Sequence, residues 1–192
     1  MYNSKVAELS PLEADLRKFL GSCMKRYWHS FVEPAVGSTM GAADMSFLFP
    51  GANFPMPVEV KTATVLAGTP RRLRPSKIRP VQILWHEQLA RHGGLSCFLM
   101  GVPVPKPYRG FKVYALGDCS RHTLLGWKDG FLPQQLVKII DPIETPANIY
   151  YLNTAAWKAH MMAHSRHLSP VALGQPHQPS AEPAGAPKRA AL

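Results

Sequence analysis

The fold is decided by residues 41–63, which read GAADMSFLFPGANFPMPVEVKTA. Residues 44–49 are largely apolar and predict a strand. The Pro-Gly-Ala-Asn sequence at 50–53 is a strong turn signal. In residues 58–63 apolar and polar side chains alternate, which predicts a second strand. Together these residues are expected to form a β-hairpin.

The hairpin sets a register between its two strands. If residues 49 and 54 flank the turn, Asp44 lies directly opposite Glu59, and cross-strand neighbours have Cβ atoms roughly 5 Å apart. Alternation along the strand places Glu59 and Lys61 on the same face. Two carboxylates so placed can hold one hard divalent cation, and magnesium needs few protein carboxylates. A lysine beside them can stabilise charge on an attacking water.

Two prolines weaken this register. Pro55 and Pro57 have no backbone N–H to donate to a ladder, so this stretch is expected at a sheet edge or as irregular chain. A Glu-x-Lys sequence also arises easily by chance, and its ordinary interpretation is a solvated strand face. The case for a site therefore depends on the surrounding sequence.

A helix is predicted before the hairpin, over residues 11–28. Ser10 is a good N-cap, Pro11 suits the first helical position, and Glu13 completes a capping box. Apolar residues follow at helical spacing, so one face should be buried. After the hairpin, the same kinds of signal predict a loop at 66–76, a helix at 80–92, strands at 95–102, 111–116 and 136–140, and a helix at 145–162. These elements predict an α/β fold with a central mixed sheet flanked by helices.

The chain is basic, with 22 Lys and Arg residues against 12 Asp and Glu and a formal net charge of +10. Such a charge favours polyanionic partners, with nucleic acid first and anionic membrane second. Five basic side chains gather after the hairpin and would suit phosphate contacts, although a solvated loop is the alternative. They are Arg71, Arg72, Arg74, Lys77 and Arg79.

Other features limit the protein class. No apolar run approaches the roughly 20 residues of a membrane span, and the N-terminus does not look like a signal peptide. Cys23, Cys97 and Cys119 fit neither a disulfide framework nor a zinc site. We therefore expect no membrane partner and a cytoplasmic location, which for a viral protein is the host cytoplasm.

The order of features across residues 12–102 resembles the PD-(D/E)xK nuclease superfamily, and most of all its VRR-NUC and Holliday-junction-resolvase-like branch. Small residues precede Asp44, a hairpin leads to Glu59-Val60-Lys61, and a basic loop follows. Next come the helix start at 79–82 and a helix end at Gly93-Gly94 before an apolar strand. The usual proline before the first Asp is Ala43 here, a mild departure.

The resemblance implies a restriction-endonuclease-like fold and metal-dependent hydrolysis of phosphodiester bonds in DNA, with branched or flapped DNA among the substrates and roles in DNA repair and recombination. It implies that Asp44, Glu59 and the Val60 backbone carbonyl bind Mg²⁺, for which Mn²⁺ can substitute. Lys61 would be the catalytic lysine, and Gln82 would orient water or phosphate. A first-helix Glu often completes such sites.

Glu13 is the natural candidate for that Glu, although the capping box already accounts for it, and Glu33 is a weaker substitute. The predicted organisation is a nuclease domain at 1–164, with its catalytic core at about 11–117, and a disordered Pro- and Ala-rich tail at 165–192. Two alternatives stay open: a non-catalytic nucleic-acid-binding module on a nuclease fold, and a viral structural or assembly protein. A homodimer is also left open.

Overall fold

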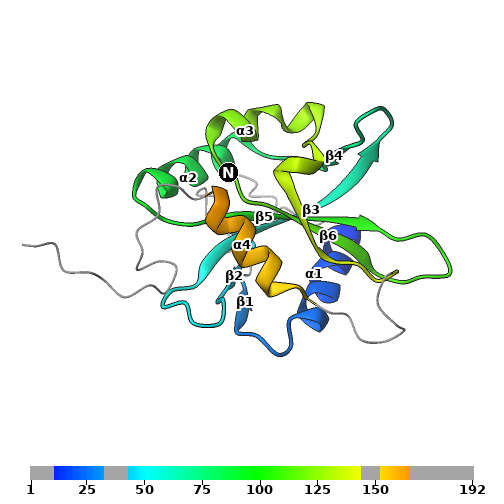
Figure 1. The fold of residues 1–192 in the computed structure, drawn as a ribbon, viewed down its shortest axis with the longest axis horizontal. Coiled ribbons are helices and arrows are strands. Elements are labelled where there is room, and N and C mark those ends of the chain that lie inside the picture. The colour runs from blue at the N-terminus through cyan, green and yellow to red at the C-terminus, as the bar shows by residue number, and fades with distance from the viewer. Residues whose placement is uncertain (1–10, 33–42, 144–151, 165–192) are drawn as a thin grey trace, which may run out of the picture.

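The computed structural model describes residues 11–32, 43–143 and 152–164. They form a seven-stranded mixed sheet with helices on both faces (Figure 1). The predicted α/β class, with a central mixed sheet flanked by helices, is therefore confirmed. The strands are β1 (His29–Phe31), β2 (Met45–Phe47), β3 (Met56–Leu66), β4 (Arg72–Pro75), β5 (Cys97–Pro103), β6 (Phe111–Leu116) and β7 (Leu136–Ile140). The helices are α1 (Pro11–Cys23), α2 (Pro80–Arg91), α3 (Arg121–Leu125) and α4 (Thr154–His164), with 3-10 turns η1 (Gly126–Asp129) and η2 (Pro133–Gln135).

The strands follow the order β1-β2-β3-β5-β6-β7, and β4 pairs with β3 outside this path. Only β3 and β5 run parallel, and α2 belongs to the crossover between them. The other pairs are antiparallel, and short connections join β2 to β3, β3 to β4 and β5 to β6. The long strand β3 therefore lies in the interior of the sheet, where it pairs with β2, β4 and β5.

The predicted hairpin register is confirmed. Met45 pairs with Val58, Ser46 with Pro57 and Phe47 with Met56, and one more step places Asp44 level with Glu59. The turn at 50–53 lies where the sequence places it, with a positive φ of 78° at Gly51. The register is fixed because a slip of one residue would turn Met45 and Phe47, both fully buried, out of the core.

The expectation that the proline stretch lies at an edge is wrong for Pro57, which is part of interior β3. Successive residues of a strand point their N–H groups to opposite edges, and the Val60 N–H points to the β2 edge of β3. The nitrogen of the odd-numbered Pro57 therefore faces β5. The ladder with β5 begins only at Val58, so no hydrogen bond is lost there.

The predicted loop at 66–76 is partly wrong, because β4 lies within it and pairs with the end of β3 from Ala63 to Leu66. Strand β1 was not predicted at all. The α1 helix ends at Cys23 rather than near Trp28, and residues 24–27 form a turn in which the Tyr27 N–H donates to the Met24 carbonyl at 2.8 Å. The turn stays packed on the core, so apolar spacing continues past the helix end.

The two faces of the sheet carry separate apolar clusters. Helices α1 and α4 pack on one face, through residues such as Leu16 and Trp157, and α2 and α3 pack on the other through Ile83 and Leu124. In Figure 1, α2 and α3 lie in the upper part of the view, and the blue α1 lies in the lower part. Helix α1 lies close to the sheet, since a Cβ at Gly101 of β5 would sit 2.4 Å from Leu16 Cδ1.

Some predictions fall partly or wholly outside the described residues. The C-terminal helix predicted at 145–162 is found in part: α4 begins at Thr154, after the non-helical Leu152 and Asn153, and ends at His164, while residues 144–151 are not described. Ser10, Glu33 and the tail at 165–192 also lie outside the described residues. Cys23, Cys97 and Cys119 are buried and unbridged, as core residues would be. None of the helices in the described part of the chain is long and apolar enough to cross a membrane.

Candidate active site

The candidate site lies at a gap along one edge of β3. The Val60 N–H donates to the Asp44 carboxylate, and the Thr62 carbonyl accepts from the Ser76 N–H at 2.7 Å. These two residues have the same parity, so β2 and β4 lie on the same edge of β3, opposite β5. Between the two short ladders the edge is open. The Val60 carbonyl, which points the same way as its N–H, faces this gap.

Asp44 closes the gap from the β2 side. Its Oδ2 accepts the Val60 N–H at 2.8 Å, and its Oδ1 accepts a hydrogen bond from Arg17 Nη2 of α1. The residue sits just before β2, so its position follows from the hairpin register. A buried backbone donor that no strand satisfies is thereby paired with a carboxylate.

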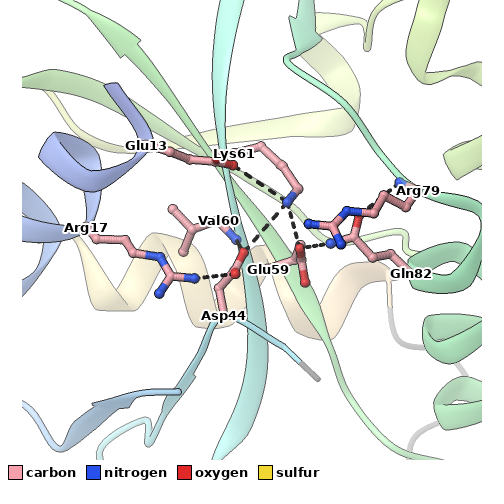
Figure 2. Close-up of polar contacts among 8 residues, drawn as sticks. All are labelled: Glu13, Arg17, Asp44, Glu59, Val60, Lys61, Arg79 and Gln82. Carbon is pink, nitrogen blue, oxygen red and sulfur yellow. Dashed lines mark hydrogen bonds and ion pairs between the residues drawn. The ribbon is translucent and has the colours of Figure 1, made fainter. Parts of the chain in front are cut away.

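Glu59 and Lys61 point toward the α2 face of the sheet. In the β3–β5 register Glu59 pairs with Phe98 and Lys61 with Met100, and both partners belong to the cluster beneath α2. Lys61 Nζ lies 2.7 Å from Glu59 Oε1 and 3.8 Å from Asp44 Oδ2. The predicted trio is therefore brought together, with the ammonium between the two carboxylates (Figure 2).

Glu59 is 1% exposed. Burial raises the pKa of its carboxyl to about 8, the Lys61 charge opposes this shift, and the Asp44 charge adds to it. A carboxyl with this pKa is largely protonated at neutral pH in the absence of a further cation. A further cation beside Glu59 would therefore favour the ionised form of its carboxyl.

Gln82 reaches the site from the first turn of α2. Its Oε1 accepts the Arg79 backbone N–H at 2.9 Å, and its Nε2 donates to Glu59 Oε1. The side chain is buried rather than exposed on the surface of the helix. Because one end of the amide satisfies the helix N-terminus, the other end is held toward Glu59.

Glu13 reaches the site from α1, and its Oε1 lies 3.7 Å from Lys61 Nζ. The carboxylate therefore lies near the other two acids, as the nuclease resemblance implies for a first-helix Glu. Figure 2 shows Glu13 and Arg17 on one side of β3 and Gln82 on the other. The open edge of β3 is what lets helices from opposite faces of the sheet meet at Lys61.

Two residues of this cluster were not predicted. Arg17 follows Glu13 by one helical turn and pairs with Asp44. His86 follows Gln82 by one turn, is fully buried, and has its Nδ1 2.7 Å from Ser96 Oγ. Burial, and to a smaller extent the Lys61 charge, lower the pKa of His86 to about 3. The i, i+4 spacing from Glu13 and from Gln82 was the signal that could have identified both.

The predicted phosphate-binding residues lie directly before β4, on β4, and on the segment that joins β4 to α2. Arg72 is half-buried and its Nη1 lies 3.4 Å from the Gly130 carbonyl, which ties it to the fold. Arg79 immediately precedes α2 beside Gln82 (Figure 2). The remaining three residues, Arg71, Arg74 and Lys77, are exposed.

A divalent metal ion can be tested against these donors. The described residues contain no ready-made group of three or more His, Cys, Asp or Glu side chains placed to hold a metal. Magnesium, however, takes one or two protein carboxylates and fills its other positions with water and phosphate oxygens. Asp44, Glu59 and the Val60 carbonyl are all hard oxygen donors, and burial keeps the pKa of the Glu59 carboxyl raised although Lys61 lies beside it. The donor set fits such an ion.

Comparison of the chain with protein-family models, with curated proteins and with solved structures gave no match.

Proposed function

We propose that the protein is a magnesium-dependent nuclease that hydrolyses phosphodiester bonds in DNA. One observation carries the proposal: the carboxylates of Glu13, Asp44 and Glu59 meet around the Lys61 ammonium, and Gln82 donates to Glu59. These residues come from four separate segments of the sequence. A solvated strand face would not bury Glu59 and Lys61 together. Buried ionisable groups that perturb one another are typical of functional sites.

Within this proposal, Asp44, Glu59 and the Val60 carbonyl hold the metal on the open edge of β3. The bound metal neutralises the phosphate and lowers the pKa of a bound water. Lys61 stabilises negative charge on the attacking water and on the transition state. Gln82 holds Glu59 in one orientation and can in turn contact water or phosphate.

The restriction-endonuclease-like fold is part of the same proposal. The mixed sheet, the central hairpin and the helices on both faces agree with it. DNA as the substrate is supported by the net charge of +10 and by the exposed basic side chains that lead from β4 into α2. The branched or flapped form of the DNA rests on the resemblance alone.

The test is a cleavage panel of single-stranded, duplex, flapped and four-way DNA, with magnesium or with EDTA. Wild-type protein is compared with Glu59→Gln and with Glu87→Gln, which makes the same substitution on α2 at a residue that pairs with Arg91 at 2.7 Å and with Arg121 at 3.7 Å. Wild type and Glu87→Gln should cut at least one DNA form only when magnesium is present. Glu59→Gln should cut none. Equal cutting by all three proteins would contradict the proposal.

A second candidate is a non-catalytic module that binds nucleic acid. The observation in its favour is that the charges of the site already compensate one another, because Arg17 pairs with Asp44 and Lys61 pairs with Glu59. This candidate predicts DNA binding that needs no magnesium, and no cleavage by any variant in the same panel.

A further inference from the structure

Both oxygens of Asp44 are occupied by groups of the protein itself. Arg17 Nη2 donates to Oδ1, the Val60 N–H donates to Oδ2 at 2.8 Å, and Lys61 Nζ lies 3.8 Å from Oδ2. A metal ion that needs Asp44 must therefore approach a carboxylate already paired with a guanidinium. Two cations at one carboxylate repel each other, so Arg17 and the metal compete.

Arg17 has donors to spare. A guanidinium carries five N–H groups in a planar fork. The Nε of Arg17 is buried and has no hydrogen-bond partner within the described part of the chain. Leaving a buried donor unpaired costs free energy. The present contact with Asp44 therefore does not satisfy this side chain.

The Arg17–Asp44 pair lies on the more accessible side of the site. Their side chains are 14% and 17% exposed, whereas Glu59 is 1% and Lys61 7% exposed (Figure 2). A metal ion and a phosphate can reach this pair more readily than the buried side near Gln82. The same guanidinium that pairs with a carboxylate is also well suited to a phosphate, through two parallel hydrogen bonds.

We propose that Arg17 is a positioning residue that couples metal binding to DNA binding. In the free protein it pairs with Asp44. Once a metal ion has taken Asp44, Arg17 turns to a backbone phosphate of the DNA beside the metal. This inference rests on the proposed nuclease function. Because linkage is reciprocal, magnesium should tighten DNA binding by the factor by which DNA tightens magnesium binding.

The first measurement is calorimetric titration of the free protein with magnesium. Arg17→Gln is compared with wild type and with Lys18→Gln, which removes the same charge from an exposed position on α1. Arg17→Gln should bind magnesium about tenfold more tightly or better, within the roughly 5- to 150-fold range of coupling between sites. Lys18→Gln should match wild type. Arg17→Lys keeps the charge without the planar fork and should fall between them.

The second measurement is the affinity for a short duplex with and without calcium, an oxygen-seeking cation used in place of magnesium, with the DNA checked by gel for being uncut. The metal-dependent gain in affinity should be smaller for Arg17→Gln than for Lys18→Gln. Melting temperatures are recorded for all variants. If Arg17 only ties α1 to the sheet, its variants lose melting temperature and gain no magnesium affinity, and the inference is overturned.

The two proposals fail differently. If wild type binds magnesium and Arg17→Gln and Arg17→Lys bind it no more tightly, only the coupling role of Arg17 is wrong. If neither wild type nor any variant binds magnesium, the metal-dependent function is wrong and the coupling role falls with it.

Discussion

The Glu59 side chain is shielded from water, although its neighbours in sequence are ordinary strand residues. It is buried, it accepts hydrogen bonds from Lys61 at 2.7 Å and from Gln82, and its pKa is raised to about 8. Burial outweighs the favourable Lys61 charge because desolvation penalises the ionised carboxylate more than one ammonium compensates it. The residue therefore destabilises the metal-free fold once it is forced to ionise.

This residue predicts a pH dependence of stability. The unfolded chain ionises Glu59 near its ordinary value of 4.5, whereas the folded protein holds the proton up to about 8. The contribution of the protonated group is fully present below the lower value and is lost as the pH rises through the upper one. Urea denaturation should show wild type losing stability across this interval relative to Glu59→Gln.

Magnesium should reverse the loss, because a divalent cation favours the ionised carboxylate and its binding releases the proton. Proton release on magnesium addition can be measured by calorimetry in buffers of different ionisation enthalpy. A flat difference between wild type and Glu59→Gln across the interval in the absence of magnesium would show that Glu59 is not a neutral buried carboxyl.

At the scale of elements, the sequence predicted those helices and strands that local sequence patterns determine. The hairpin register, α2, β6 and β7 follow from turn residues, alternation and helix-ending glycines, and the structure has them where they were expected. Strand β1, which was not predicted, has three residues and is too short for a periodic signal. Strand β4 forms because β3 extends beyond its ladder with β5, which depends on tertiary structure.

The same distinction applies to the candidate site. Asp44, Glu59 and Lys61 lie on one hairpin, so a register argument could bring them together. Arg17 and His86 enter from helices on opposite faces of the sheet, and only the packing of those helices places them beside the hairpin. The gap between β2 and β4, which opens the site to α1, likewise forms because these two strands pair with different parts of β3. No local sequence pattern predicts it.

Strand β4 carries a prediction about DNA contact. Arg74 is exposed and pairs in register with Thr64, while Arg72 is partly engaged with Gly130. If this strand faces DNA, Arg74→Ala should weaken binding at low salt and flatten the log–log salt dependence by up to about one unit. Fluorescence anisotropy over a range of salt concentrations measures the slope.

The control for Arg74 is Arg91→Ala. Arg91 has the same charge and is exposed, but it lies at the last turn of α2 and pairs with Glu87 at 2.7 Å. Its slope should stay that of wild type. Equal slopes for Arg74→Ala and wild type would place the DNA on another surface.

At the scale of the whole molecule, the C-terminal helix is connected to the hairpin that carries the site. Trp157 of α4 is fully buried, with its ring centroid 4.7 Å from that of Phe47 and 4.9 Å from that of Phe49. Phe47 lies in β2, three residues from Asp44. Trp157 thus packs against residues more than a hundred positions earlier in the chain and stabilises the position of β2.

Trp157→Ala should lower the free energy of unfolding by about 3–5 kcal/mol, because it leaves a large cavity in the main core. Met162→Ala on the same helix should change it by about 0.5 kcal/mol or less, since that side chain is 40% exposed. Urea denaturation of both variants measures the difference. A small effect of Trp157→Ala would mean that α4 is not part of the cooperative fold.

The central claim is that Asp44 and Glu59 hold a metal ion and that Lys61 acts on the water. It is tested most directly by calorimetric magnesium titration beside a cleavage time course for Asp44→Asn, Glu59→Gln and Lys61→Ala. Each variant should lose cleavage, on the order of 10³-fold or more, if metal activation and charge stabilisation supply several kcal/mol of the barrier. All three should still bind DNA. Asp44→Asn and Glu59→Gln should also lose magnesium affinity, whereas Lys61→Ala should keep it, because the ammonium is not a ligand. Cleavage by Asp44→Asn at the wild-type rate would contradict the claim.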